Sequence, residues 1–254
     1  MIDLTGKKGL VVGIANRESI AWGCATVARA CGARLAVTYL NEKGRAHVQP
    51  LAEELGAEFL LPLDVESDGQ TDALFHELAT GWGGLDFLIH SIAFAPAADL
   101  HGRVVDCSLA GFERAMRISC YSLIEMARGA EPLMKEGGTI VTMSFGGADR
   151  VVANYNLMGP VKAALQCTVR YLADELGPLG IRVHALSPGP VRTRAASGLA
   201  RFDRLVEDAT QHSPLGRLVT IEEIGSTAAF LVSDGARGLT GDTLYVDGGR
   251  HVVC

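Results

Sequence analysis

Tyr155 and Lys162 are the two side chains of this sequence whose types and spacing most clearly suggest chemistry. They are seven residues apart, close to two turns of an α-helix, so we expect both to leave the same helix face. An ammonium group there can bind a ribose hydroxyl, and its charge favours a negatively polarised phenol oxygen. Such pairs also arise by chance on amphipathic helices, so the surrounding elements must support the interpretation.

A glycine turn follows the first expected strand, at 9–12. The chain passes from Gly13 through Ser19 and Ala21 to Gly23. A turn that leads from a glycine into a helix N-terminus offers free N–H groups and a partial positive charge, which suit a pyrophosphate. Only the outer glycines of the Gly-x-Gly-x-x-Gly fingerprint remain here, so an ordinary glycine turn stays open as an alternative.

Polar and small residues follow the next strands. Leu40 and Asn41 after the second strand are uncharged, whereas the 2′-phosphate of NADPH calls for arginine or lysine there, so the sequence favours NADH. Asp64 and Val65 end the third strand and 90–93 the fourth, at the edge where a dinucleotide lies in such sheets. At His90 a hydrogen-bonded structural role is favoured over acid–base catalysis.

Strand-length and helix-length segments alternate along the whole chain. The expected strands lie at 9–12, 35–39, 59–63, 87–89, 139–143, 182–186 and 244–246, and none shows the period-two pattern of a half-exposed strand. The expected helices include 71–80, 111–134, 155–176 and 221–232, the last opened by a capping box of Thr220 and Glu223. This order predicts an α/β fold with a Rossmann-type, doubly wound parallel sheet of about seven strands.

The domain organisation is expected to be simple. No linker, repeat or low-complexity tract interrupts the alternation, so we expect a single dinucleotide-binding domain over 1–254. One segment, 188–213, breaks the rhythm with a Pro/Gly turn and a polar helical stretch. Its place at the carboxyl edge of the sheet predicts a helical substrate lid.

Composition excludes several classes of protein. The 254 residues carry a net charge of −6, which argues against a nucleic-acid binder, and 48% of them are hydrophobic, which argues against disorder. No secretory signal and no apolar run of roughly 18 residues is evident, so a cytoplasmic protein without a membrane span is expected. The six cysteines lack metal-site spacing, and we expect free thiols and no metal site.

Several segments together resemble one known family. They are 13–23, 90–96, 118–122, 154–163, 189–198 and 246–249. With these, the whole chain is similar to the short-chain dehydrogenase/reductase superfamily and, within it, to the NADH-dependent enoyl-acyl-carrier-protein reductases of bacterial fatty-acid synthesis. The Tyr-x6-Lys spacing and the His-Ser-Ile-Ala-Phe-Ala segment favour this branch over ordinary carbonyl reductases.

The resemblance implies reduction of a trans-2-enoyl thioester of acyl-carrier protein by a homotetramer. Tyr155 would stabilise the developing oxyanion and Lys162 would hold the nicotinamide ribose. The implied cofactor contacts are Gly13, Ser19, Ile20, Asp64, Val65, Ser91, Ile92, Ala93, Lys162, Val191 and Thr193. The implied substrate contacts are Phe94, Ala95, Phe145, Tyr155, Met158, Ala195 and Ala196.

The sequence also departs from the family pattern. Phe145 stands where many members have a second tyrosine, so Tyr155 would be the sole phenol of the site. Arg201 and Arg204 are basic lid residues that would meet an acidic carrier protein, but a solvated helix face explains them equally well. Two other functions stay open: a short-chain carbonyl or alcohol dehydrogenase, and a catalytically silent NAD-binding paralogue.

Overall fold

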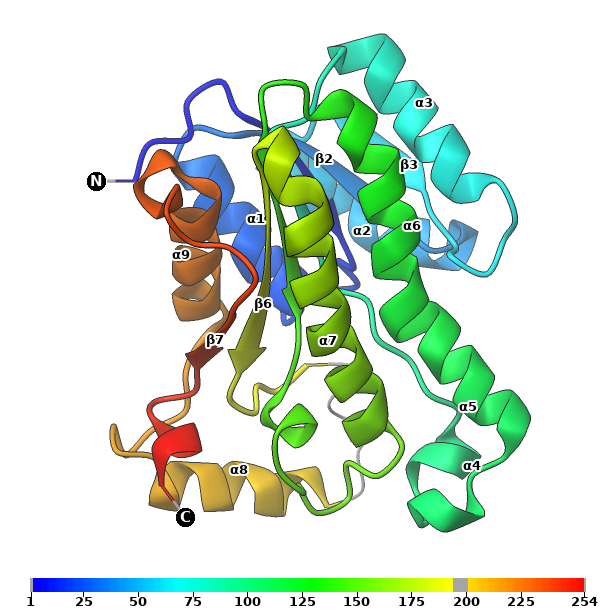
Figure 1. The fold of residues 1–254 in the computed structure, drawn as a ribbon, viewed down its shortest axis with the longest axis vertical. Coiled ribbons are helices and arrows are strands. Elements are labelled where there is room, and N and C mark those ends of the chain that lie inside the picture. The colour runs from blue at the N-terminus through cyan, green and yellow to red at the C-terminus, as the bar shows by residue number, and fades with distance from the viewer. Residues whose placement is uncertain (1, 194–200, 254) are drawn as a thin grey trace.

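The computed structural model describes residues 2–193 and 201–253, in which seven strands form one parallel sheet (Figure 1). The strands are β1 (Lys8–Val12), β2 (Arg34–Tyr39), β3 (Phe59–Pro62), β4 (Phe87–His90), β5 (Gly138–Met143), β6 (Ile181–Pro188) and β7 (Thr243–Val246). Their order across the sheet is β3-β2-β1-β4-β5-β6-β7, and every pair is parallel. The predicted doubly wound fold is confirmed.

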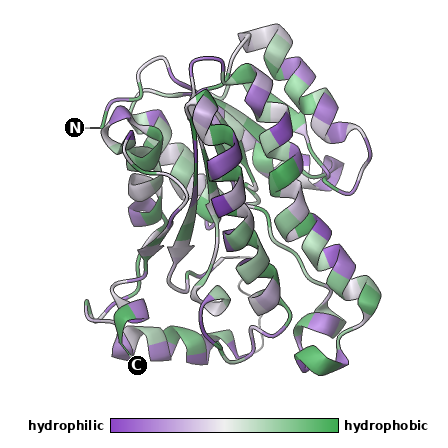
Figure 2. Ribbon diagram, viewed as in Figure 1, coloured by the Kyte–Doolittle hydropathy of each residue, from purple (hydrophilic) through white to green (hydrophobic). Residues whose placement is uncertain are grey.

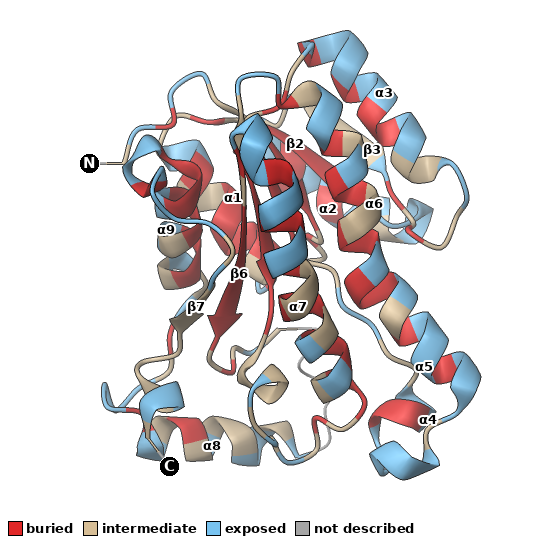
Figure 3. Cartoon of the chain, viewed as in Figure 1, coloured by how far each residue is buried: buried red, intermediate tan, exposed pale blue. Residues whose placement is uncertain are grey.

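Helices cover both faces of this sheet. The α-helices of the described residues are α1 (Ile20–Ala30), α2 (Glu42–Leu55), α3 (Gln70–Trp82), α4 (Ala97–Leu100), α5 (Leu109–Met116), α6 (Ser122–Ala130), α7 (Met158–Leu176), α8 (Phe202–His212) and α9 (Ile221–Val232). One apolar core lies between the sheet and α1, α2 and α9, and a second lies between the sheet and α3, α6 and α7. Hydrophobic and hydrophilic residues therefore alternate around these helices, and the strands are largely buried (Figures 2 and 3).

The strand order reverses at β1, which pairs with β2 on one side and β4 on the other. All strands run in the same direction, so their carboxyl ends lie at one edge of the sheet, at the bottom of Figure 1. This edge gathers Gly13, Asp64, Ser91 and Ser144, each at or just after a strand end. A crevice at such a reversal is where open α/β sheets bind their ligands.

The helix expected at 111–134 differs in detail. The chain is helical from Leu109 to Ala130, but α5 and α6 are joined by a π-helical stretch, Arg117–Tyr121. Wider π turns are rare and occur mostly as single inserts within α-helices. The sequence pattern carries no period that indicates this insert.

The helix expected at 155–176 begins later, and the expectation that Tyr155 lies on it is wrong. Helix α7 starts at Met158, and Tyr155 lies in the preceding turn. Asn154 and Asn156 on either side have φ angles of 64° and 43°, a left-handed conformation that Asn tolerates better than most residues and that excludes a regular right-handed helix.

The segment 188–213 starts at the end of β6 and ends just after α8, so its polar helical stretch is confirmed. Ala195 and Ala196, expected to contact substrate, lie outside the described residues. The capping box of α9 is confirmed, with Thr220 and Glu223 bonded reciprocally. Among 2–193 and 201–253, no helix is both long and apolar enough to cross a membrane, and no group of three metal-ligating side chains occurs.

Helices α1 and α9 approach each other through two glycines. A Cβ on Gly23 would lie 2.3 Å from the Ile221 carbonyl oxygen, and one on Gly225 would lie 2.3 Å from the Gly23 carbonyl oxygen. Backbone meets backbone here, so no side-chain rotation can relieve the contact. Gly23, expected in the phosphate turn, therefore serves helix packing.

Gly23→Ala is expected to destabilise the fold by about 1–3 kcal/mol, because the added methyl group forces α1 and α9 apart. Gly44→Ala on α2 is the matched control, since its Cβ would have no neighbour closer than 3.6 Å; it should stabilise the fold by roughly 0.5–1 kcal/mol. Urea unfolding measures both changes. Equal stability of the two variants would contradict the close-packing role of Gly23.

Candidate active site

Lys162 reaches the carboxyl edge of the sheet from the first turns of α7. Its side chain is buried, at 4% exposure, and Nζ donates a hydrogen bond of 2.6 Å to the carbonyl oxygen of Met143 at the end of β5. Burial lowers the pKa of Lys162 to about 8, and the Cys120 thiol opposes this only in part. No carboxylate within 2–193 and 201–253 forms an ion pair with this ammonium group, which is thus available to a ligand hydroxyl.

Tyr155 lies in an apolar cluster beside this lysine's helix. The centroids of the Tyr155 and Phe145 rings are 4.7 Å apart. The Tyr155 ring also packs against Gly147, where a Cβ would lie only 2.3 Å from a ring carbon. Burial raises the pKa of the Tyr155 phenol. The hydroxyl group therefore stays protonated near neutral pH and can donate a hydrogen bond.

Three of the expected substrate contacts join Tyr155 in this cluster. Ala95, Phe145 and Met158 pack with it and with Leu100. Phe94 is 40% exposed, and the Arg114 guanidinium lies 4.7 Å from its ring centre. An apolar wall of this kind, next to one phenol, suits a hydrocarbon chain whose polar end meets the tyrosine.

The loop that carries Phe94 is held by Ser119, which lies in the segment 118–122 but was not predicted as a site residue. The Ser119 hydroxyl, in the π-helical stretch, accepts from the Phe94 N–H at 2.9 Å and donates to the Phe94 carbonyl at 3.1 Å. Gly147 was likewise not predicted as a site residue, although the Gly-Gly pair at 146–147 is a visible signal of close approach. Ser119 offers no such signal.

The glycine turn after β1 has the geometry of a phosphate cradle. A Cβ on Gly13 would lie 2.0 Å from the Ser91 carbonyl oxygen, and its φ is 107°, so glycine is required there. The Ser19 hydroxyl accepts from the N–H groups of Ala15 and Asn16, at 3.0 and 3.1 Å, and fixes the turn. The N–H groups of Ile20 and Ala21 precede the first hydrogen bonds of α1, which Trp22 and Gly23 donate to the Ser19 carbonyl, and can meet an anion.

The other expected cofactor contacts are distributed along the same edge. Val65 is buried, and Asp64 Oδ1 accepts from the Glu66 N–H at 2.9 Å. Ile92 packs against the core of the α3, α6 and α7 face, and Val191 against the core of the opposite face. Ala93 lies in the loop after β4 and Thr193 at the start of the segment 188–213.

His90 is held in one tautomer by its neighbours. Ser122 Oγ donates to the Ile118 carbonyl at 2.6 Å, so it accepts from His90 Nε2 at 2.8 Å. Nδ1 then accepts from the Thr142 hydroxyl, also at 2.8 Å. Burial, and secondarily the charge of Lys162, lower the pKa of His90 to about 3. This neutral, fully bonded histidine fits a structural role.

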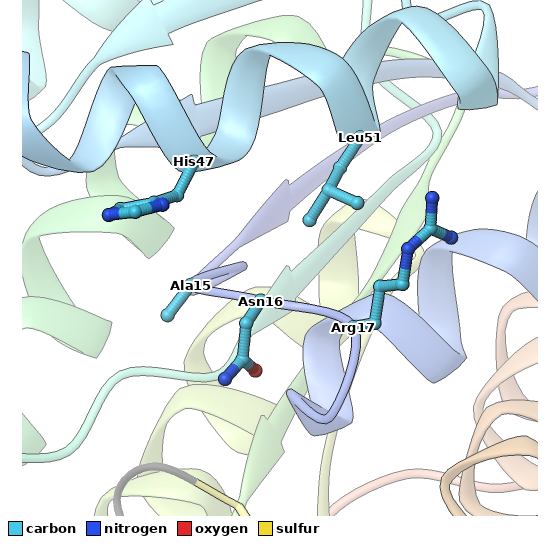
Figure 4. A pocket seen from close by; sticks show the side chains of 5 residues that line it. All are labelled: Ala15, Asn16, Arg17, His47 and Leu51. Carbon is cyan, nitrogen blue, oxygen red and sulfur yellow. The ribbon is translucent and has the colours of Figure 1, made fainter.

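A shallow hollow of about 320 Å³ flanks the glycine turn (Figure 4). Ala15, Asn16 and Arg17 of the turn form one side of it, and His47 and Leu51 of α2 form the other. The Arg17 guanidinium is engaged by Glu54 and lies over the Trp22 ring at 5.3 Å. The hollow therefore borders the nucleotide end of the edge and is separate from the Tyr155 cluster.

Known proteins resemble this chain in sequence and fold. A family model described as Enoyl-(Acyl carrier protein) reductase matches residues 13–251. The NADH enoyl-[acyl-carrier-protein] reductase FabI of Synechocystis sp. is 48% identical, over 100% of this chain and 99% of that protein. The Anaplasma phagocytophilum reductase in complex with NAD has a TM-score of 0.95 at 48% identity and covers 98% of this chain and 95% of that one. The Bacillus cereus reductase with NADP+ and indole naphthyridinone has a TM-score of 0.97 at 44% identity, over 100% of both chains.

Lys162→Met is expected to stabilise the protein without cofactor by about 2 kcal/mol at pH 7. Lowering the lysine pKa from 10.5 to about 8 corresponds to a cost of about 3 kcal/mol in the free energy of folding, which the variant avoids. Loss of the hydrogen bond to Met143 reduces this gain in stability by about 1 kcal/mol. The unfolded chain binds the extra proton between pH 8 and 10.5, so the advantage is complete below pH 8 and fades as the pH rises through that window. Denaturant unfolding at about pH 7 and pH 9.5 measures it; a variant less stable at the lower pH would contradict the cost of burial.

Proposed function

The chain belongs to the enoyl-(acyl carrier protein) reductase family, and we propose that it reduces the trans-2 double bond of an enoyl thioester in fatty-acid elongation, with NADH as the reductant. One observation supports the proposal most strongly. A buried lysine and a buried tyrosine, Lys162 and Tyr155, meet the carboxyl edge of the sheet beside a glycine turn and an apolar wall. This combination serves a dinucleotide and an acyl chain at once.

The residues of the chain fit NADH. Gly13 lets the turn after β1 pack against Ser91 and lead into the N-terminus of α1, where a pyrophosphate would bind, and the buried Lys162 ammonium offers a donor to a ribose hydroxyl. NADH, when bound, would supply the hydride that is added to the β-carbon of the enoyl thioester, and the α-carbon then takes up a proton, which gives the saturated thioester and NAD⁺. Lys162 orients the nicotinamide half in this proposal, so binding and turnover depend on it together.

Tyr155 acts on the other end of the conjugated system. Negative charge develops on the thioester oxygen as the β-carbon is reduced, and the protonated Tyr155 hydroxyl donates a hydrogen bond to that oxygen. Its apolar surroundings strengthen this interaction because little water competes. Phe145 carries no hydroxyl group and contributes a wall of the acyl site rather than a proton.

The end of β2 explains the preference for NADH. Asn41 Oδ1 is engaged as the N-cap of α2, accepting from the Gly44 N–H at 2.9 Å, and Leu40 beside it is an exposed aliphatic side chain. Arg45 lies 3.6 Å from Glu42 and over the Tyr39 ring. Of the two basic residues that follow this strand, Lys43 and Arg45, Arg45 is therefore already engaged, which disfavours a 2′-phosphate there.

The acyl-carrier protein is the proposed partner of the segment 188–213, which we propose to be the lid of a single domain. Arg201 and Arg204 are exposed at the start of α8, and Asp203 between them pairs with Arg192 at 2.8 Å. Two exposed guanidinium groups beside the lid suit an acidic carrier, although the net charge of the enzyme is −6. A cytoplasmic location stays a prediction of the sequence.

A homotetramer is part of the proposal. The exposed large hydrophobic side chains include two pairs on different elements: Tyr121 and Tyr171, 43% and 67% exposed, near α6 and on α7, and Phe230 and Leu239, 38% and 42% exposed, at and after α9. Two such pairs suit the two kinds of interface of a tetramer with twofold symmetry. Light scattering should give four times the 26.8 kDa chain mass; a stable monomer would remove this part.

The activity is tested by mixing purified protein, NADH and crotonyl or dodecenoyl thioester and following the loss of NADH absorbance. A panel of ketones serves as the control for carbonyl reduction. Ketone reduction without enoyl reduction would instead identify a carbonyl reductase, and cofactor binding without either turnover would identify a silent paralogue.

Tyr155→Phe and Lys162→Met should separate the two roles. Tyr155→Phe is expected to lower kcat by roughly 10²–10³-fold, the range for loss of one oxyanion donor, with NADH affinity nearly unchanged. Lys162→Met is expected to weaken both NADH binding and turnover. NADH titration and steady-state kinetics measure the two effects. Unchanged NADH affinity in Lys162→Met would contradict the orienting role.

A further inference from the structure

A polar network links the buried side chain of Gln166 on α7 to the exposed carboxylate of Asp149 and takes no part in the mechanism above. Gln166 follows Lys162 by one turn of α7 and is 6% exposed. Its Nε2 donates to Ser144 Oγ at 2.9 Å and to Asp149 Oδ2 at 3.3 Å. These bonds join α7 to both ends of the loop 144–149, which follows β5.

The C-terminal strand joins the same network. The Tyr245 hydroxyl on β7 donates to Asp149 Oδ2 at 2.8 Å, so one carboxylate oxygen receives two donors from distant parts of the chain. The Tyr245 ring stacks on His251 at a centroid distance of 4.0 Å. Arg150, the residue that follows the loop, donates to the Arg250 carbonyl at 3.1 Å. The loop is thus fixed from two sides, by α7 and by the C-terminal segment.

The loop held in this way is the one on which Tyr155 rests. It carries Phe145, whose ring contacts the tyrosine ring, and Gly147, which leaves room for that ring. Tyr155 itself lies in a turn rather than on α7, so the helix alone does not fix it. A shift of the loop would move the phenol relative to the lysine, and misplacement of about 1 Å can cost on the order of 10²-fold in rate.

We propose that Asp149 and Gln166 are positioning residues that hold the loop 144–149 beneath Tyr155, with Tyr245 as their anchor on the C-terminal strand. The role rests on the proposed function, since it acts through the catalytic tyrosine. Neither side chain touches substrate or cofactor in this assignment.

The donor and acceptor pattern makes the role testable by exchange. The carboxylate of Asp149 accepts only, so Gln166 must face it with its amide nitrogen. Gln166→Glu would set a buried carboxylate against that of the exposed Asp149 and break the link. Adding Asp149→Asn restores it with reversed polarity, because the new amide nitrogen, in the place of Oδ2, can donate one hydrogen to the carboxylate introduced on α7 and the other to the Tyr245 hydroxyl, which can accept.

The experiment compares the single variant Gln166→Glu, the double variant Asp149→Asn/Gln166→Glu and the control Gln49→Glu. Like Gln166, Gln49 donates a hydrogen bond from its side-chain amide to a carboxylate, that of Glu53, at 3.1 Å. Gln49 is, however, exposed on α2. Gln166→Glu should lower kcat for the enoyl thioester by roughly tenfold or more, with the NADH dissociation constant changed less than about twofold. The double variant should recover most of the lost kcat, and Gln49→Glu should match the unaltered protein.

Tyr245→Phe keeps the proposal falsifiable if Gln166→Glu does not fold. It removes one donor to Asp149 and leaves the stacked ring, and it should lower kcat severalfold, whereas the control Gln49→Glu should again match the unaltered protein. Unchanged kcat in both Gln166→Glu and Tyr245→Phe would overturn the proposal. So would a double variant that folds but recovers no activity.

Failure of the proposed enzymatic function can be distinguished from failure of the positioning role. If the unaltered protein oxidises no NADH with any enoyl thioester, the enzymatic function falls, and the positioning role falls with it. If the unaltered protein is active and the variants match it, only the positioning role falls.

Discussion

Burial of the Lys162 ammonium group is the constraint on which the site depends. A lysine at 4% exposure, held by one carbonyl group, is unfavourable for folding, because burial disfavours the charged form. The fold tolerates it because α7 packs along β6, and the apolar side chains buried on that face of the sheet offset the cost. A ligand hydroxyl placed at Nζ would add the hydrogen bond that the interior lacks, so the lysine that destabilises the free protein is the group best prepared to bind the cofactor.

The same site depends on close approaches that only glycine allows. Gly13 lets the turn after β1 touch the end of β4, and Gly147 lets the ring of Tyr155 lie against its loop. Gly23 and Gly225 bring α1 and α9 into backbone contact. Each of these glycines lacks a Cβ at a point where a backbone carbonyl group or an aromatic ring of another segment lies in contact with it. The glycine-rich composition is therefore partly a consequence of how tightly the carboxyl edge is built, rather than of flexible loops.

The limits of prediction follow from the range of the interactions involved. Apolar strand runs and the order of elements depend on local pattern, so the parallel sheet and the capping box of α9 could be predicted. The position of Tyr155 could not, because it depends on Asn154 and Asn156 adopting left-handed conformations, and helical spacing from Lys162 gave a misleading geometry. Ser119 and Gln166 were beyond reach for a related reason, since their partners lie 25 and 22 residues away in the chain and no local pattern encodes them.

The placement of Tyr155 in a turn also changes how the pair with Lys162 must be understood. On one helix, the two side chains would be fixed by a single backbone geometry. Here the lysine is fixed by α7 and the tyrosine by a turn that rests on the loop after β5, so two separate packing arrangements together determine the position of the phenol relative to the ammonium group. Phe145 contributes to the position of the phenol through its ring contact alone, and a hydroxyl group on this residue is unnecessary for it. The catalytic geometry is therefore a property of the β5–α7 connection as a whole, and residues that stabilise this connection contribute to catalysis without touching the reacting atoms.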